Sequence, residues 1–309
     1  MNTSLRGAIY GLTAAAIWGG MYVVSDIVLA VIPPFTLLSI RLLMAAAILG
    51  IMLRRVPNAR QPHGAERLRL FGVGFIGFGI SVGAQFVGTD LSTAVNGTLV
   101  TSASPAFILI FAAILLREHL TLFRIIAVTL ATIGVIVIID PANANFGSQT
   151  FAGDMALAVA AITWGLYSVL VRRVSAQFDT LVVSFYAFIG GLFLTLPAAA
   201  LELGSRSIGV IDGGVLLGIL YLGIVSTAIA MWMWNRAFAL IDASVASLFF
   251  FAQPLVGTLL STLLLDQQMT STLWVGTGFI VSGVLLSLVR LEKRNTLVTP
   301  AHATISDGQ

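Results

Sequence analysis

The chain has 309 residues, of which 58% are hydrophobic and only 9% are charged, and its formal net charge is +3. Soluble domains carry about 25% charged residues, so this composition predicts a protein whose outer face meets lipid. The chain contains no cysteine, which excludes disulfides, thiolate catalysis and zinc fingers. Its three histidines show no metal-ligand spacing.

Ten apolar segments follow one another along the chain, and most approach the roughly 20 residues that a membrane-spanning helix needs. The first is too long for the apolar core of a signal peptide, so it is interpreted as a span. The segments are 8–29, 35–53, 68–89, 94–116, 124–139, 153–174, 180–201, 212–238, 243–265 and 272–290. The polar tail 295–309 is predicted to be disordered. The predicted fold class is an all-α membrane protein with ten transmembrane helices.

The positions of lysine and arginine predict the orientation of the spans, because cytoplasmic loops are enriched in these residues. With a cytoplasmic N-terminus and ten alternating spans, only Arg206 falls outside, and only Arg41 lies within a span. The other fourteen basic residues fall on the cytoplasmic side: Arg6, Arg54, Arg55, Arg60, Arg67, Arg69, Arg117, Arg124, Arg172, Arg173, Arg236, Arg290, Lys293 and Arg294. This asymmetry predicts that both termini and the tail are cytoplasmic. It also explains the basic pI without nucleic-acid binding.

Two stretches of the chain resemble each other at an offset of 149 residues, which indicates an internal duplication. The first contains Leu91, Ala94, Pro105, Glu118-His119-Leu120-Thr121 and Gly134-Val135, and the second contains Leu240, Ala243, Pro254, Gln267-Gln268-Met269-Thr270 and Gly283-Val284. Trp18-Gly19 and Trp164-Gly165 form a further pair at an offset of 146. Because each copy has five spans, an odd number, the second copy must be inverted, and inverted repeats are typical of secondary transporters.

These motifs resemble the EamA family of the drug/metabolite transporter superfamily. The resemblance covers residues 8–290 and implies two EamA-like five-helix repeats, 1–146 and 147–294. It rests on Ala16-Ile17-Trp18-Gly19, on Ile162-Thr163-Trp164-Gly165-Leu166-Tyr167-Ser168, and on the stretch from Pro105 through Arg117-Glu118-His119-Leu120-Thr121 to Gly134-Val135 with its second copy. The second copy has Gln267 where the family commonly has an acidic residue, which weakens any role for a paired carboxylate.

The resemblance implies a secondary transporter of the bacterial inner membrane that exports small amphipathic metabolites, most of all amino acids, aromatic ones included. A multidrug carrier and a sugar or nucleotide-sugar carrier are the alternatives within the superfamily. Nucleotide sugars should need several cationic side chains, and only Arg41 is available within a span. An intramembrane lipid-modifying enzyme would need two convergent catalytic groups, for which we find no convincing pair. The expected partners are a small-molecule substrate and the bilayer, with the chain a monomer or homodimer.

The stretch Gly72-Val73-Gly74-Phe75-Ile76-Gly77 matches a dinucleotide-binding fingerprint by letter. It lies inside an apolar span with no strand before it, so the structural context of that fingerprint is absent. With Gly79 and Gly83 it predicts a small-residue face for helix packing. The chain also lacks a Walker motif. We therefore expect no cofactor, no bound metal and no catalytic residue.

Two prolines predict kinks in the fourth and ninth spans. Pro105 and Pro254 lie near the middle of their segments, where proline frees the carbonyl four residues earlier, at Thr101 and Phe250. A freed carbonyl in lipid needs protein or water as a partner, so two repeat-related kinks predict a central cavity. Helix packing alone is the alternative.

Aromatic and neutral polar residues within spans complete the candidate site. Trp18 and Trp164 lie near mid-depth, where a buried indole either lines the substrate path or packs against neighbouring helices. Neutral polar residues such as Gln253 and Asn235 should face inward, away from lipid. The predicted substrate-binding set is Trp18, Tyr22, Gln85, Thr101, Ser102, Trp164, Tyr167, Phe250 and Gln253.

Arg41 and Asp26 lie at similar depth on the first two spans, which are joined by a short turn. An intramembrane arginine needs a partner, so the two predict a structural ion pair. The alternative is that Arg41 binds a substrate carboxylate. No span has a central carboxylate for a proton relay, although Asp26 and Asp90 keep proton coupling open.

Glu118 and His119 fall in the turn between the fourth and fifth spans. We expect Glu118 to pair with Arg117 or Arg124 or to cap the fifth span. A gating or proton-transfer role is the alternative.

Overall fold

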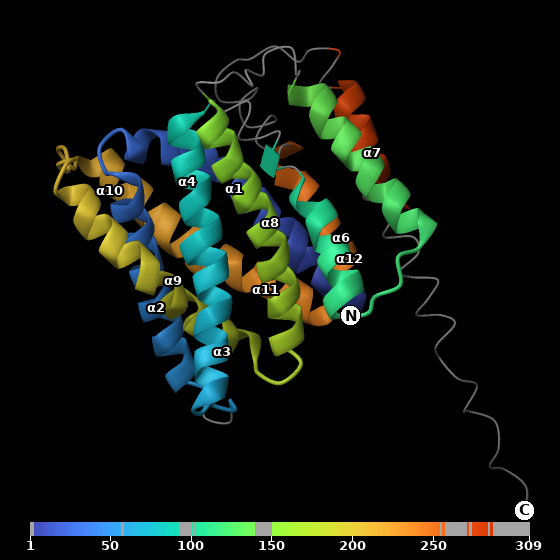
Figure 1. The fold of residues 1–309 in the computed structure, drawn as a ribbon, viewed down its shortest axis with the longest axis horizontal. Helices are drawn as coiled ribbons and strands as arrows, with labels where there is room; N and C mark the ends of the chain where they lie inside the picture. The colour runs from blue at the N-terminus through green and yellow to red at the C-terminus, as the bar shows by residue number, and fades with distance from the viewer. Residues whose placement is uncertain are drawn as a thin grey trace, which may run out of the picture.

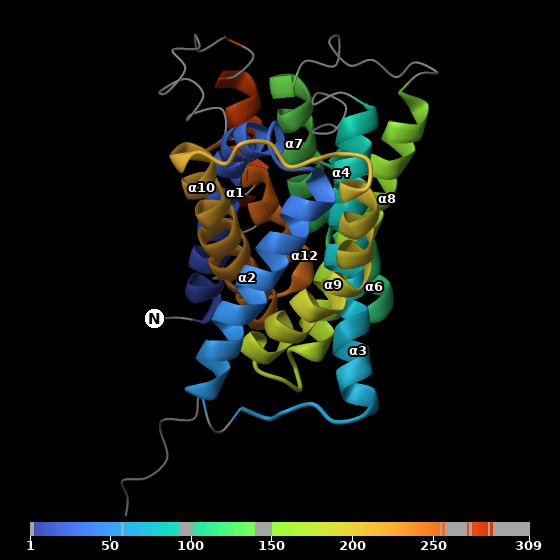
Figure 2. The same ribbon diagram turned by 90° about the vertical axis from the view of Figure 1, so that its left-hand side faces the viewer.

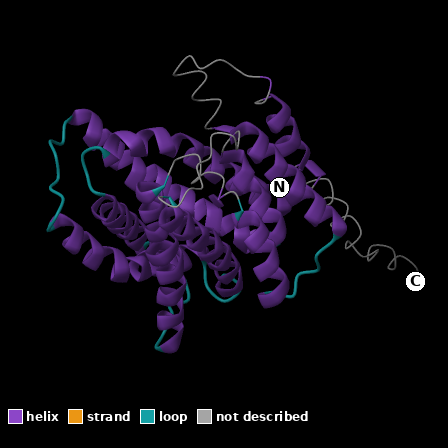
Figure 3. Cartoon of the chain, turned by 45° about the horizontal axis from the view of Figure 1, so that its top comes forward, coloured by secondary structure: helices purple, strands orange, loops and turns teal. Residues whose placement is uncertain are grey.

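The structure is a computed structural model of the chain that describes residues 3–56, 59–92, 100–101, 103–139, 150–253, 255–256, 271, 274–283 and 285–286. Within the helices, the side chains at positions 22, 23, 26, 89, 90, 135, 138 and 139 also lie outside the description. The secondary structure of these ranges is helical, without a strand, as Figure 3 shows. This result confirms the all-α fold class for the described residues.

The helices follow the predicted segments. The first half contains α1 (Thr3–Leu29), α2 (Pro34–Arg54), α3 (Ala65–Gly74), η1 (Phe75–Ser81), α4 (Val82–Leu91), α6 (Ser104–Leu115) and α7 (Leu122–Ile139). The second half contains α8 (Phe151–Val174), α9 (Thr180–Leu203), α10 (Gly213–Leu220), η3 (Tyr221–Ile229), α11 (Ala230–Leu240), α12 (Ala243–Ala246), η4 (Ser247–Phe251) and an unlabelled helix at Trp274–Gly283. Here η1 and η3 are π-helical and η4 is a 3-10 helix.

Five helices of the described residues are long and apolar enough to cross a membrane: Pro34–Arg54, Ala65–Gly88, Phe151–Val174, Thr180–Leu203 and Gly213–Leu240. Shorter apolar helices lie at Ser104–Leu115, Leu122–Gly134 and Trp274–Gly283. The 27-residue α1 packs in the same bundle (Figure 1). The chain is therefore a multi-pass helical membrane protein, while the count of ten spans stays a prediction.

Pro105 lies close to a break between helical segments in the fourth predicted span. The described helix α6 begins at Ser104, so Pro105 lies in its first turn. Proline is favoured there because the missing N–H would have no partner within the helix and the fixed φ suits a helix start. Helical residues also lie just before the turn at Ala103, at positions 100 and 101, and Ser102 lies outside the described residues, so the kink at Pro105 stays a prediction. Its repeat counterpart, Pro254, lies outside the described residues.

The two halves of the chain interleave. The most extensive contacts between helices are α2 with α9, α1 with α11, α4 with α8, α3 with α9, α9 with η1, and α6 with α8. Each of these pairs joins an element of the first half to one of the second, and Figure 2 shows α4 beside α8. The predicted boundary between the repeats, at 146 and 147, lies outside the described residues.

Close approach between helices depends on glycine at several contacts. A Cβ atom at Gly74 would collide with the backbone of Ala187, and one at Gly190 with the backbone of Phe71. Nothing lies within 4 Å of the Cβ position at Gly72. The predicted small-residue face thus exists with Gly72 as an exception, and its other members that meet neighbouring atoms are Gly77, Gly79 and Gly83.

The repeat relation is visible in the contact between α7 and the helix Trp274–Gly283, which lie side by side in Figure 1. A Cβ atom at Gly134 would lie 2.6 Å from the carbonyl oxygen of Gly276, and one at Gly283 would lie 2.6 Å from that of Ala127. The offset of 149 relates Gly134 to Gly283 and Ala127 to Gly276. The two contacts are therefore equivalent, because the repeat exchanges one for the other, as a two-fold axis does. The pairing also shows that the two equivalent helices run antiparallel, as an inverted repeat requires.

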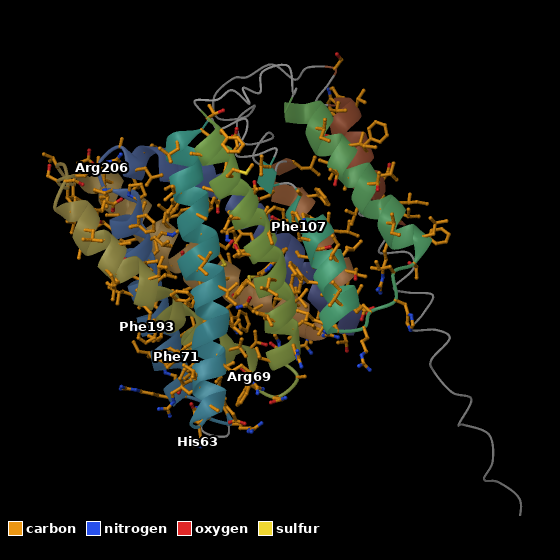
Figure 4. The ribbon with its side chains drawn as sticks, in the orientation of Figure 1. His63, Arg69, Phe71, Phe107, Phe193 and Arg206 are labelled. Carbon is orange, nitrogen blue, oxygen red and sulfur yellow. The ribbon has the colours of Figure 1, made fainter. Side chains whose placement is uncertain are left out.

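The basic residues labelled in Figure 4 separate along the bundle. Arg69 of α3 and His63 lie toward one end, whereas Arg206 lies toward the other end. This separation agrees with the predicted placement of Arg69 and Arg206 on opposite sides. The cytoplasmic location of the Arg69 end stays a prediction.

Candidate functional site

An aromatic cluster lies where the two halves meet. Trp18 of α1 and Trp164 of α8 have ring centroids 6.0 Å apart in an edge-to-face arrangement. Trp234 of α11 lies 5.2 Å from Trp18, and Tyr167 of α8 lies 5.1 Å from Trp164. All four side chains are buried. We call these four residues the aromatic cluster, and it brings the repeat-related Trp18 and Trp164 into direct contact.

The three indole N–H groups of the aromatic cluster differ in their hydrogen bonding. Trp18 Nε1 donates to the Ser226 carbonyl at 3.0 Å. The Nε1 atoms of Trp164 and Trp234 are buried and have no hydrogen-bond partner among the described residues. Buried indole N–H groups usually find a partner, so these two donors, and the equally unpaired Nε1 of Trp232 outside the cluster, depart from the common pattern.

A hydrogen-bonded chain fixes the tyrosine of the cluster. Tyr167 Oη donates to Asn235 Oδ1 at 3.0 Å, and Asn235 Nδ2 donates to Ser184 Oγ at 3.0 Å. All three side chains are buried, and together they join α8, α11 and α9. Tyr167 also packs against Phe78 of η1, with centroids 5.2 Å apart. The ring is therefore held from three sides.

Arg41 of α2 is only 4% exposed. Its Nε donates to Thr227 Oγ1 at 2.9 Å, and one terminal nitrogen contacts Met21 Sδ at 3.3 Å. No carboxylate among the described side chains lies within ion-pair distance of this guanidinium. The side chain of Asp26 lies outside the described residues, so the Asp26–Arg41 ion pair stays a prediction.

Arg41 and the aromatic cluster are linked through η3. Thr227, which binds Arg41, directly follows Ser226, whose carbonyl binds Trp18. η1 begins at Phe75 and η3 begins at Tyr221, an offset of 146 residues. The two repeats therefore carry π-helical segments at equivalent places. Such segments occur frequently at functional sites. Hydropathy did not predict them, because a π-helix and an α-helix have the same apolar composition.

The structure brings together some predicted site residues. Trp18, Trp164 and Tyr167 lie in the aromatic cluster, and Phe250 is half-buried with its ring 6.0 Å from that of Trp234. Gln253 is buried, while Gln85 on α4 and Thr101 are half-buried. The side chain of Tyr22 and all of Ser102 lie outside the described residues.

Trp234 and the Ser226–Thr227 pair are site residues that the sequence reasoning missed. At an offset of 146, the residue equivalent to Trp234 is Gly88, so no repeated motif marks Trp234. A buried tryptophan two residues from a second one, Trp232, was the available signal. No group of three or more histidine, aspartate or glutamate side chains in the described residues could hold a metal ion.

Glu118 links the two halves away from the aromatic cluster. It accepts hydrogen bonds from the N–H groups of Ala243 and Ser244 at 2.8 and 3.2 Å, and from Ser244 Oγ at 2.6 Å. Arg124 pairs with Glu118 at 3.5 Å and also with Asp242. The expected pairing with Arg124 is thus present, but Glu118 caps the start of α12 instead of the fifth span.

Comparisons with known proteins agree with this architecture. The sequence profile of the EamA-like transporter family matches residues 5–140 and again residues 151–289. A permease-like protein of Bacillus subtilis, YdzE, is 54% identical over 74 residues, which is 24% of this chain and 95% of that protein. An uncharacterized inner membrane transporter of Salmonella typhimurium, YicL, is 28% identical over 95% of this chain and 98% of its own.

A solved crystal structure has the same fold. It superposes with a TM-score of 0.79 at 22% sequence identity and covers 93% of this chain and 98% of that one. An uncharacterized transporter of Archaeoglobus fulgidus is 23% identical over 89% of this chain and 94% of its own. The two matches to the family profile together span most of this chain, so the chain belongs to the EamA-like transporter family.

Proposed function

We propose that this protein is a secondary transporter that exports small amphipathic metabolites, most of all amino acids, by alternating access through the aromatic cluster. The proposal includes ten spans in two inverted five-helix repeats, in the bacterial inner membrane, with both termini cytoplasmic. It also holds that the chain catalyses no reaction and needs no cofactor.

The contact between Trp18 and Trp164 is the observation that carries the proposal. These residues occupy equivalent places in the two repeats and meet with centroids 6.0 Å apart. In transporters built from inverted repeats, substrate sites lie at the interface between the repeats. The antiparallel contact of Gly134 and Gly283 with the opposite repeat supports the same symmetry.

The chemistry of the aromatic cluster favours a small amphipathic substrate. Ligand sites are mostly apolar and aromatic walls with a few placed polar groups, which here include Asn235 and Arg41. Arg41 is the only buried lysine or arginine of the described residues. A nucleotide sugar carries two phosphate charges and would need more cationic groups, so we place amino acids before it.

Flux in proteoliposomes tests the proposal. Vesicles containing the purified protein would be loaded with labelled amino acids, and efflux would be followed with and without a pH gradient. We expect saturable efflux of at least one amino acid, and the gradient would show whether protons are coupled to it. Trp164→Ala should abolish most of the flux. Trp232→Ala is the matched control, because Trp232 packs against Tyr10 and not in the aromatic cluster.

Two results would contradict the proposal. Absence of saturable flux for every amino acid in a broad panel would remove the amino-acid class. Equal flux in Trp164→Ala, Trp232→Ala and the unsubstituted protein, all folded by size-exclusion chromatography, would remove the aromatic cluster from the substrate path.

A further inference from the structure

Two buried indole N–H groups of the aromatic cluster have no hydrogen-bond partner among the described residues. They belong to Trp164, which is 8% exposed, and to Trp234, which is fully buried. Both rings contact Trp18, so both donors belong to one cluster. Leaving a buried donor unpaired disfavours the folded state, so a group that pairs with it is stabilised there.

The indole N–H can only donate a hydrogen bond. A substrate group that satisfies Trp164 and Trp234 must therefore be an acceptor. An ammonium group has three donors and no acceptor, so it cannot pair with them.

The charge near the aromatic cluster favours an anionic acceptor over a neutral one. Arg41 is buried and binds Thr227, the residue after the one whose carbonyl binds Trp18. No described carboxylate lies within ion-pair distance of Arg41. A buried cation in low-dielectric surroundings attracts an anion strongly, and charge-assisted hydrogen bonds are the stronger kind.

We propose that the aromatic cluster recognises the carboxylate of its substrate, through the indole N–H groups of Trp164 and Trp234 and the positive charge of Arg41. This inference rests on the proposed function above and deepens it. The amino group of an amino acid contributes little to recognition. The substrate class therefore extends to small hydrophobic carboxylates that lack an amine, and it leaves out amines that lack a carboxylate.

Four indole compounds separate the contributions of the two groups. Tryptophan carries both a carboxylate and an ammonium group, 3-indolepropionate carries only the carboxylate, its methyl ester carries neither charge, and tryptamine carries only the ammonium group. Isothermal titration calorimetry with the purified full-length protein in detergent would measure the affinity for each. We expect tryptophan and 3-indolepropionate to bind comparably, and the ester and tryptamine to bind at least about tenfold more weakly.

Phenylalanine substitutions remove the two N–H groups and keep aromatic rings. Trp164→Phe and Trp234→Phe should each reduce the preference for 3-indolepropionate over its methyl ester by about tenfold. The ratio of the two affinities is the chosen measure, because lost stacking or partial unfolding affects both compounds alike. Trp232→Phe is the matched control, since Trp232 also has an unpaired Nε1 but lies against Tyr10. It should keep the preference of the unsubstituted protein.

Three outcomes would overturn the inference. Tryptamine or the ester could bind as tightly as 3-indolepropionate. Both cluster variants could keep the full acid-over-ester preference. No carboxylate of the series could bind at all. Proteoliposome flux of a wider amino-acid panel is measured separately, so transport that persists under these outcomes would leave the proposed function standing and remove only the carboxylate recognition.

Discussion

The contact between α7 and the helix Trp274–Gly283 gives a sharp stability prediction. Replacing Gly134 or Gly283 with alanine places a Cβ 2.6 Å from a backbone carbonyl oxygen, and real Cβ atoms do not approach below 3.0 Å. Each substitution therefore forces the two helices apart by at least about 0.4 Å. A backbone carbonyl cannot rotate away as a side chain can, so the strain must spread along both helices.

The expected magnitude combines two opposing terms. Overpacking of this kind costs about 1–3 kcal/mol, while glycine to alanine in a helix gains up to about 1 kcal/mol from propensity. We expect Gly134→Ala and Gly283→Ala each to destabilise the protein by about 1–2 kcal/mol. Gly278→Ala is the matched control. Gly278 lies on the same helix as Gly283, and nothing lies within 4 Å of its Cβ position. It should be neutral or stabilising.

Unfolding by sodium dodecyl sulfate from mixed micelles, followed by circular dichroism, measures these differences. The double variant Gly134→Ala with Gly283→Ala should be less destabilised than the sum of the single variants, since both push the same two helices apart. The reasoning is refuted if the single variants are as stable as Gly278→Ala, or if the double variant is strictly additive.

Three further predictions concern polar contacts. Asn235→Ala leaves its buried tyrosine and serine partners unpaired and should cost about 1–3 kcal/mol in the same unfolding assay, and a variant as stable as the parent would contradict this. The carboxylate recognition proposed above leads us to expect additive effects of Arg41→Ala and Asp26→Ala in a double-mutant cycle, whereas coupled effects would support the alternative Asp26–Arg41 ion pair and remove Arg41 from the substrate site. Glu118→Ala removes three hydrogen bonds at the start of α12 and should cost about 1–3 kcal/mol, whereas Ser244→Ala, which removes one of them, should cost less, and equal losses would contradict the capping role.

The sequence predicted what depends on composition and periodicity. Apolar length located the helices, and the duplicated Gly134-Val135 and Gly283-Val284 pairs predicted equivalent elements that the structure shows in mutual contact. The contact of Trp18 with Trp164 was not predicted. Their repeat relation shows that they occupy equivalent places, but it does not show that they lie close together.

Features that depend on backbone detail or on partners distant in sequence were not predictable. The start of α6 at Ser104 was not predicted, because proline suits the first turn of a helix as well as a kink within one, and hydropathy cannot separate the two. The repeat counterpart of Trp234 is Gly88, not a tryptophan, so only the fold places Trp234 against Trp18. Glu118 caps a helix 125 residues away in sequence, whereas its position in the chain suggested that it caps the fifth span, which follows it directly.

The interleaved packing constrains how access could alternate. Because α2 packs on α9 and α1 on α11, the sequence halves cannot separate as two rigid bodies without breaking the most extensive contacts in the molecule. At the helix ends, single carboxylates link the two halves by hydrogen bonds. Glu118 caps α12, and Glu202 of α9 accepts hydrogen bonds from the N–H groups of Phe35 and Thr36 at the start of α2.

These two carboxylates lie toward opposite ends of the bundle, since Glu202 is close in sequence to Arg206 and Glu118 follows α6 (Figures 1 and 4). A helix N-terminus released from such a cap regains water as a partner, so the loss of one cap costs only about 1–2 kcal/mol. Separating α2 from α9 would instead expose a face that glycine and aliphatic residues bury. Breaking the caps at the helix ends is therefore expected to cost less than separating the two halves.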